Sequence, residues 1–197
     1  MAAEQGLIAS RAALGDWLAA LVSHGSLRND LLLLAAAYHC AAAGDINGLA
    51  DANALARALQ PSAERYLETT QQGGSFLAAI KASWPHAALH GLTVTFAGDV
   101  SYPIAVGVAA AAHRIPLAAT LEAFAFTFVT NLSSAAIRLS IVGQTDAQSI
   151  IASLSPMLIN AAHQAGLGTL DDIGGATFSA DLCSLEHETQ YSRLFRS

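Results

Sequence analysis

The stretch Leu31-Leu-Leu-Leu-Ala-Ala-Ala-Tyr-His-Cys-Ala-Ala-Ala43 decides the fold of this chain. It contains no charged residue, it is apolar on nearly every side, and Gly44 follows it as a typical helix-ending residue. A helix that is apolar all round is buried on all sides, so we expect a central helix surrounded by others. The segment is shorter than the ~18–20 apolar residues that a membrane span requires.

Apolar residues recur at helical spacing on both sides of this segment. Before it, Ser10 is a candidate N-cap and Gly25 ends the pattern. After it, Asp45 is a candidate cap of a third helix, and Pro61 suits the first turn of a fourth. The first third of the chain is therefore predicted to be helical throughout.

The pair Gly73-Gly74 either ends the fourth helix or lies inside a longer helix that reaches Trp84. Two glycines lower helix stability. The apolar pattern nevertheless resumes beyond them, at Phe76, Leu77 and Ile80, so we predict the longer helix.

The segment from Pro85 to Gly98 has no helical pattern. It holds the only strand-like alternation of the chain, Leu92-Thr-Val-Thr-Phe96. A lone strand has no partner to pair with, so we expect a loop or an extended link here.

Further helices follow this link. Pro103 and Pro116 suit the first turns of two helices. Thr145 or Asp146 is the expected cap of another, which runs to Ala165 with a kink at Pro156. A glycine-rich loop from Gly166 to Gly175, which we expect to be mobile, precedes a last helix that Ser179 or Asp181 opens.

These patterns predict an all-α fold, a single-domain bundle of about eight helices over residues 1–197 with a partly disordered C-terminal tail at 187–197. The chain is long enough for one sizeable core, and it shows no internal repeat and no linker that would separate domains.

Composition limits the class of partner. Hydrophobic residues make up 53% and charged residues 12%, so part of the surface is expected to face another protein. The net charge of −6 and the lack of a basic run argue against nucleic acid and anionic membranes. The start has no signal-peptide pattern, so we expect a cytoplasmic protein whose two cysteines, Cys40 and Cys183, are free thiols.

Sequence motifs for catalysis are missing. The chain has no P-loop, no Gly-x-Gly-x-x-Gly, no Gly-x-Ser-x-Gly and no Cys-x-x-Cys. We therefore predict no enzymatic activity and no cofactor. The alternative is a helical enzyme that uses Glu122, Asp171 and Asp172 as acid and base, although their spacing is not that of a ligand set.

Seven histidines raise the question of a metal site. His86 and His90 are four residues apart, but no Cys, Asp or Glu lies near them to complete a site. His39 belongs to the apolar central segment and is expected to be a core residue. We predict no metal site.

The last eleven residues, His187-Glu-Thr-Gln-Tyr-Ser-Arg-Leu-Phe-Arg-Ser197, combine cations with two aromatic residues. Arginine and tyrosine carry much of the binding energy at protein interfaces. If the segment is helical, Glu188, Tyr191 and Phe195 share one side. Composition alone leaves two interpretations: a helix that docks on its own core, or a recognition tail.

The amino-acid sequence of this tail closely resembles the C-terminus of the urease accessory protein UreF family. A second stretch, Asn131-Leu-Ser-Ser-Ala-Ala-Ile-Arg-Leu139 followed by Gly143-Gln144, resembles that family's helix ending in a basic residue before a Gly-Gln turn. The order of helices agrees from about Gly6 to Ser197. On physical grounds alone, Arg138 is a cation well placed at a helix C-terminus.

The resemblance implies a non-catalytic, usually dimeric, all-helical chaperone and scaffold for nickel incorporation into apo-urease. It implies a complex with UreD (also called UreH) and the GTPase UreG, with the tail forming part of the surface where the GTPase docks. The partner-binding residues that it implies are His187, Glu188, Tyr191, Ser192, Arg193, Leu194, Phe195 and, less directly, Arg138 and Gln144. The alternative function is a nickel carrier that uses the histidines.

The chain departs from the family pattern at its start. Members of the family normally begin earlier, with a helix after a Pro-x-Gly-type segment and a Ser-x-Gly-Leu-Glu-like motif. This chain begins at Met1-Ala-Ala-Glu-Gln-Gly-Leu7, beyond that point. We expect the missing N-terminal family helix to leave an apolar groove exposed.

Overall fold

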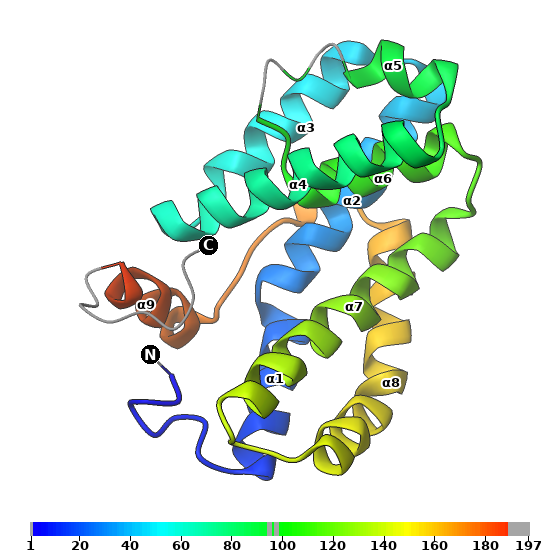
Figure 1. Ribbon diagram of the computed structural model, residues 1–197. Helices are drawn as coiled ribbons and strands as arrows, with labels where there is room; N and C mark the ends of the chain where they lie inside the picture. The colour runs from blue at the N-terminus through cyan, green and yellow to red at the C-terminus, as the bar shows by residue number, and fades with distance from the viewer. Residues whose placement is uncertain (1, 94–95, 97–98, 189–197) are drawn as a thin grey trace.

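The computed structural model describes residues 2–93, 96 and 99–188. Within them the chain forms nine α-helices, one 3-10 turn and no strand, which confirms the predicted all-α fold (Figure 1). The helices are α1 (Arg11–His24), α2 (Ser26–Ala43), α3 (Ile46–Ala58), α4 (Ala63–Ser83), α5 (Ala87–Thr93), α6 (Tyr102–Ala112), α7 (Leu117–Arg138), α8 (Gln144–Leu167) and α9 (Phe178–His187), with the turn η1 (Leu170–Asp172) between the last two. None of these helices is long and apolar enough to cross a membrane.

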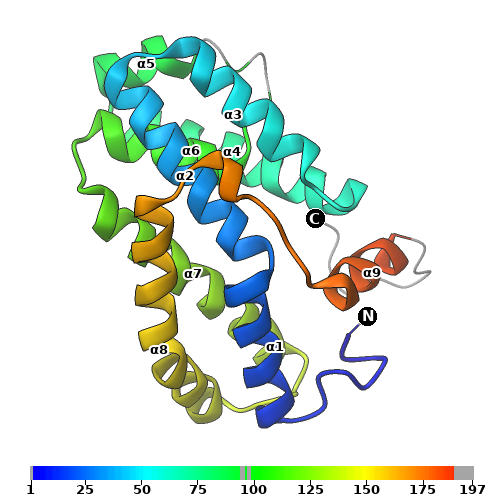
Figure 2. The same cartoon turned by 180° about the vertical axis from the view of Figure 1, so that it is seen from behind.

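Helix α2 is the central helix, as predicted. It packs against α1, α7 and α8 in one part of the molecule and against α3 and α6 in the other, and both views show it running through the middle (Figures 1 and 2). Leu27, Leu31 and Leu34 have no exposed surface. Two core clusters meet on this helix, because Leu32 and Leu34 belong to one and Leu33 to the other.

Helix α4 is continuous through Gly73 and Gly74, which confirms the longer helix. Gly73 is buried where α4 crosses the chain before α6. A Cβ built on Gly73 would lie 2.1 Å from the carbonyl oxygen of Val100, whereas one on Gly74 would meet nothing within 4 Å. The first glycine therefore allows a close backbone approach that any side chain would block.

The chain that enters α6 is fixed by one buried amide. Asn53 of α3 donates from Nδ2 to the carbonyl oxygen of Asp99 (2.8 Å) and accepts at Oδ1 from the backbone N–H of Ser101 (3.0 Å). Both backbone groups thus find a partner inside the protein, as buried polar groups must.

Several local predictions were wrong. His39, expected in the core, is exposed, and the last helix begins at Phe178 after Thr177 and not at Ser179 or Asp181. The segment expected as a loop contains helix α5, since Leu89 is fully buried in the second core cluster and packing outweighs the weak local pattern. Helix α8 begins at Gln144 with Gly143 as N-cap, and Asp146 lies in its first turn. Helix α4 begins after Ser62, whose hydroxyl caps it by accepting from the backbone N–H of Arg65 at 3.2 Å.

The glycine-rich loop expected to be mobile, Gly166 to Gly175, begins within the last turn of α8, and the residues that follow this helix are held by hydrogen bonds. The turn η1 carries a capping box formed by Thr169 and Asp172. Beyond it, the backbone N–H of Gly174 donates to Oδ1 of Asn29 (3.0 Å), and that of Ala176 donates to the carbonyl oxygen of His24 (2.8 Å). These bonds lead the chain across α2 to α9 at the side of the bundle (Figure 2).

Candidate partner-binding site

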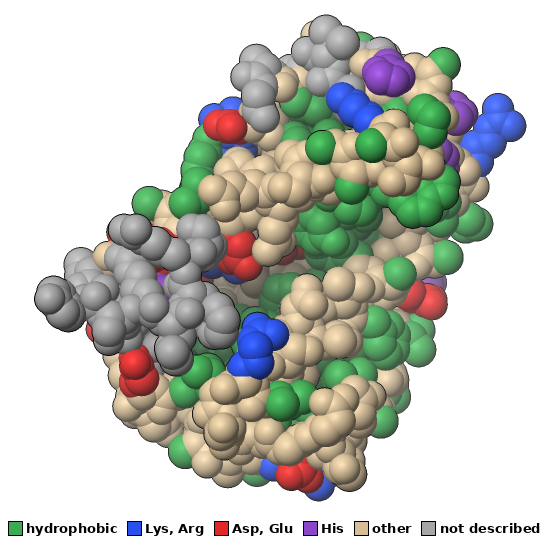
Figure 3. Space-filling model, viewed as in Figure 1, with side chains coloured by type: hydrophobic (Ala, Val, Ile, Leu, Met, Phe, Trp, Pro, Cys, Tyr) green, Lys and Arg blue, Asp and Glu red, His purple; other side chains and the backbone are tan. Residues whose placement is uncertain are grey.

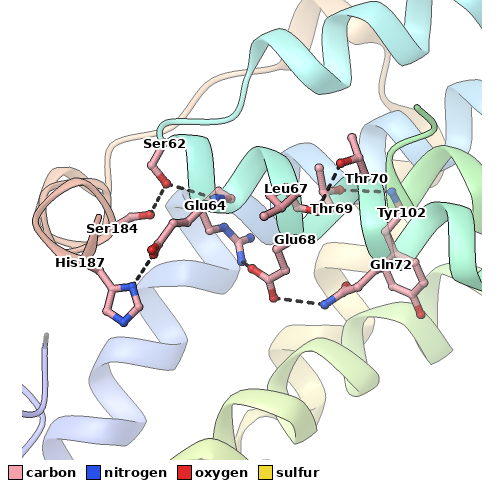
Figure 4. A network of polar contacts seen from close by, with 11 residues as sticks. Ser62, Glu64, Leu67, Glu68, Thr69, Thr70, Gln72, Tyr102, Ser184 and His187 are labelled. Carbon is pink, nitrogen blue, oxygen red and sulfur yellow. Dashed lines mark hydrogen bonds and ion pairs between the residues drawn. The ribbon is translucent and has the colours of Figure 1, made fainter. Parts of the chain in front are cut away.

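Polar contacts hold the C-terminal half of α9 against the first turn of α4 (Figure 4). The hydroxyls of Ser184 and Ser62 are 2.7 Å apart, and a carboxylate oxygen of Glu188 accepts from the backbone N–H of Ala63 at 2.5 Å. The first turn of a helix carries unpaired N–H groups and a partial positive charge. Glu188 therefore gives α4 an anionic cap from a distant part of the sequence.

His187 adds a third contact to the same turn. Its Nδ1 bonds a carboxylate oxygen of Glu64, and the two groups form an ion pair when the imidazole is protonated. The histidine side chain is 32% exposed and the glutamate 21%. At this exposure, the pair contributes modestly to stability.

The structure thus places two of the predicted partner-binding residues, His187 and Glu188, in contacts within the chain. Two others, Arg138 and Gln144, lie on either side of the turn that joins α7 to α8. Arg138 is the last residue of its helix, where a cation complements the helix dipole as the sequence predicted. The remaining predicted residues, Tyr191, Ser192, Arg193, Leu194 and Phe195, lie outside the described residues.

One side of α9 is apolar and faces solvent. None of its residues is buried. Phe178, Leu182 and Leu185, spaced four and three residues apart, are 72%, 58% and 45% exposed. This stripe along one helix face is typical of a surface that another protein covers.

A pocket of about 560 Å³ lies beside α9, between that helix, α2, α4 and α7. Its apolar wall includes Trp17, Leu33 and Phe128. Its polar wall carries four carboxylates and two basic side chains. These are Asp30, Glu64, Glu68, Asp181, Arg65 and His187. Acidic side chains are visible in the hollow between α4 and α7 in Figure 3.

Asp30 is one of these carboxylates, and it has no ion-pair partner within the described residues. Burial raises its pKa from 3.8 to about 7; Arg65 opposes the rise and Glu68 adds to it. Arg65 is occupied elsewhere, since its guanidinium pairs with the carboxylate of Glu68. No hydrogen bond or ion pair reaches Asp30 from any residue in the described ranges. Its exposed part faces the pocket.

The two cysteines are free, as predicted. Burial raises the pKa of the Cys183 thiol, and Glu186 raises it further. Burial also raises the pKa of Cys40, with Asp45 contributing. Both thiols are thus held in their protonated, weakly nucleophilic form at neutral pH.

The structure describes no group of three or more His, Cys, Asp or Glu side chains placed to hold a metal ion in residues 2–93, 96 and 99–188. His86 and His90 are four residues apart in the sequence. In the folded chain, His86 lies near a different histidine, His113. The rings of His86 and His113 have centroids 5.3 Å apart.

Ser62, Glu64 and Ser184, which anchor α9, were not predicted as site residues. Ser62 had a local signal, because it precedes a helical pattern and can cap it. Its partner Ser184 is 122 residues away in the sequence, and no periodicity connects the two.

Comparison with known proteins adds to this picture. A model of the UreF family matches residues 8–155, from before α1 to within α8. The chain belongs to the UreF family. It is 50% identical over 196 residues to a urease accessory protein UreF of Xanthobacter autotrophicus, covering 100% of this chain and 81% of that protein. UreF proteins of Azorhizobium caulinodans and Rhodopseudomonas palustris are 50% and 48% identical over the same length, with 84% and 83% of their own chains covered.

The UreF family model ends before α9, whereas the alignments with these UreF proteins cover the whole of this chain. The similarity therefore includes α9 and the tail that follows it.

Proposed function

We propose that this chain is a urease accessory protein, a non-catalytic chaperone and scaffold required for urease maturation by nickel incorporation. The observation that carries the proposal is the sequence identity to proteins of that name, which is 50% over the entire chain. Nickel is the cargo of this process, and the chain itself contributes binding surface.

The proposed partners are UreD (UreH), the GTPase UreG and apo-urease. We propose that this chain binds them in the cytoplasm as a homodimer. The apolar stripe of Phe178, Leu182 and Leu185 supports binding to other proteins, because these side chains leave water only when a partner covers them. Burial of such side chains stabilises a complex by roughly 1.5–3 kcal/mol each.

The proposed partner-binding residues are His187, Glu188, Tyr191, Ser192, Arg193, Leu194 and Phe195, with Arg138 and Gln144 as further contacts. The contacts of α9 with α4 support this assignment, since they give the residues that follow Glu188 a fixed starting point. A fixed start reduces the entropy lost when a following segment binds.

A complementation experiment tests the function. Cells that carry a urease operon but lack their own UreF would receive this chain, and urease activity and the nickel content of the purified urease would be measured. We expect both to be restored. Deletion of residues 191–197 is expected to abolish co-purification of the partner proteins while the melting temperature stays unchanged.

A matched pair of variants controls for general changes in surface polarity. Phe178→Ser with Leu182→Ser on α9 is expected to lower recovered urease activity. Ile159→Ser with Leu167→Ser, which changes exposed apolar residues of α8, is expected to leave activity unchanged. Full partner binding by the 191–197 deletion would contradict the tail assignment, and tight stoichiometric nickel binding by the isolated chain would favour the carrier function.

A further inference from the structure

Two adjoining pockets beside α9 differ in chemistry. The acidic pocket of about 560 Å³ shares Trp17, Leu21, Thr177 and Ala180 with a second pocket of about 270 Å³. The described residues of the second pocket's wall include no charged side chain, and Phe178 lies at its edge with 72% of its surface exposed. The two pockets therefore adjoin along these four residues, with an acidic pocket at one end and an apolar pocket at the other.

At the acidic end, the described lining residues include more carboxylates than basic side chains. Arg65 pairs with Glu68, and His187 pairs with Glu64. Asp30 and Asp181 also line the pocket, and neither takes part in an ion pair with another described residue. A largely desolvated carboxylate such as Asp30 is stabilised most by a cation that enters the pocket and donates to it.

The apolar end limits what kind of cation fits. A small hydrated ion would leave the second pocket empty, whereas a peptide segment can fill both pockets at once. Side chains of successive residues lie within a few ångströms of each other, which matches pockets that share four lining residues.

We propose that these two adjoining pockets receive a segment of a partner protein in which an arginine or lysine stands beside a large apolar residue. The cation pairs with Asp30 in the acidic pocket, and the apolar side chain lies against Phe178 and Trp17 in the neighbouring one. The site does not depend on the urease assignment, because it is argued only from charge and shape.

Fluorescence titration of the full chain tests the proposal. The chain has two tryptophans, so Trp84→Phe, which changes an exposed residue, leaves Trp17 as the only reporter. The probes are the peptides acetyl-Gly-Arg-Phe-Gly-amide and acetyl-Gly-Glu-Phe-Gly-amide. We expect a saturable change in Trp17 emission with the arginine peptide and none with the glutamate peptide.

Three variants locate the binding site. Asp30→Asn, which keeps the side-chain shape, is expected to weaken binding of the arginine peptide about tenfold. Phe178→Ala is expected to weaken it as well. Asp51→Asn changes an exposed carboxylate of α3 outside both pockets and is expected to have no effect. Circular dichroism of each variant confirms that it is folded.

Two outcomes would overturn the proposal. One is the absence of saturable binding, or binding that Asp30→Asn leaves unchanged. The other is binding that appears only when Arg193 and Arg196 are both replaced by alanine, since the chain's own end would then be the occupant. Neither outcome bears on nickel incorporation into urease, which the complementation experiment measures separately.

Discussion

At the scale of single residues, neighbours in the sequence can have opposite requirements. Gly73 and Gly74 share a helix and a residue type. A Cβ at Gly73 would meet the backbone of Val100 and Ser101, which has no room to move, while Gly74 borders open space. The sequence therefore shows two equal helix-weakening glycines, and only the structure shows that one is required.

Replacing each glycine by alanine separates these roles. Gly73→Ala is expected to lower the free energy of unfolding by about 1–3 kcal/mol or more, because α4 must move away from Val100. Gly74→Ala is expected to raise it by up to about 1 kcal/mol, since alanine is the better helix former. Urea denaturation measures both values. Equal effects of the two substitutions would rule out the close approach.

Asp30 is a second residue with an effect of its own, because it makes the free energy of unfolding depend on pH. Its pKa is about 7 in the folded chain and near 3.8 when unfolded. Between these values the folded chain keeps a proton that the unfolded chain has released. Stability therefore falls as pH rises from about 4 to about 7 and changes no further above that range. A residue that destabilises its own fold in this way is a candidate for function.

Asp30→Asn tests this dependence. The variant is expected to be more stable than the unmodified chain at pH 8, by about 1–3 kcal/mol, because it removes a buried ionisable group. The difference is expected to shrink as the pH falls from about 7 to about 4 and to level off below that range, where Asp30 becomes protonated in both states. Denaturation curves of the two proteins, compared at each pH, cancel the contributions of all other titrating groups. A difference independent of pH would contradict the raised pKa.

At the scale of elements, α9 differs from every other helix of the described chain. It buries no residue and is held by side-chain hydrogen bonds, from Ser184 and Glu188 to α4 and from Cys183 to Gln5. Hydrogen bonds at partly exposed positions contribute about 0.5–1.5 kcal/mol each. Such a helix is expected to open locally without unfolding the rest.

Hydrogen exchange measures this opening. The backbone amides of α9 are expected to exchange several orders of magnitude faster than those of α2. Ser184→Ala is expected to speed exchange in α9 further, with less than about 1 kcal/mol change in global stability. Ser179→Ala alters an exposed hydroxyl of the same helix and is expected to change neither. Exchange in α9 as slow as in α2 would show that the helix belongs to the core.

At the scale of the whole molecule, the two core clusters share α2. Leu33 faces one cluster and Leu34 the other, and both are almost fully buried. A helix that contributes consecutive residues to both clusters couples them, because neither cluster can open without exposing its leucines. We therefore propose that the chain unfolds as a single domain.

Two adjacent substitutions test this coupling. Leu33→Ala and Leu34→Ala are each expected to lower the free energy of unfolding by about 2–5 kcal/mol and to shift one common transition. Leu67→Ala, at a position that is 42% exposed, serves as control and is expected to change stability by less than about 1 kcal/mol. Two separate calorimetric transitions in either core variant would show independent domains.

The success of the sequence predictions depended on the range of the interactions. The central helix from Leu31 to Ala43 and the continuous α4 were predicted because apolar spacing is a local property. Helix α5 was missed, since its seven residues lack a clear pattern and packing of Leu89 decides it. The bonds that hold residues 168–177 to α1 and α2 were missed for the same reason.

The sequence by itself determined that this chain is all-helical, that an apolar helix lies at its centre, and that it resembles the UreF family. All three follow from residue spacing or from motifs, which are present in the order of the residues. Only the tertiary structure decided that α9 is held by the first turn of α4 and that Asp30, at an acidic pocket, has no ion-pair partner among the described residues. Those features join residues more than a hundred positions apart, and their energies depend on exclusion of water that only the folded chain provides.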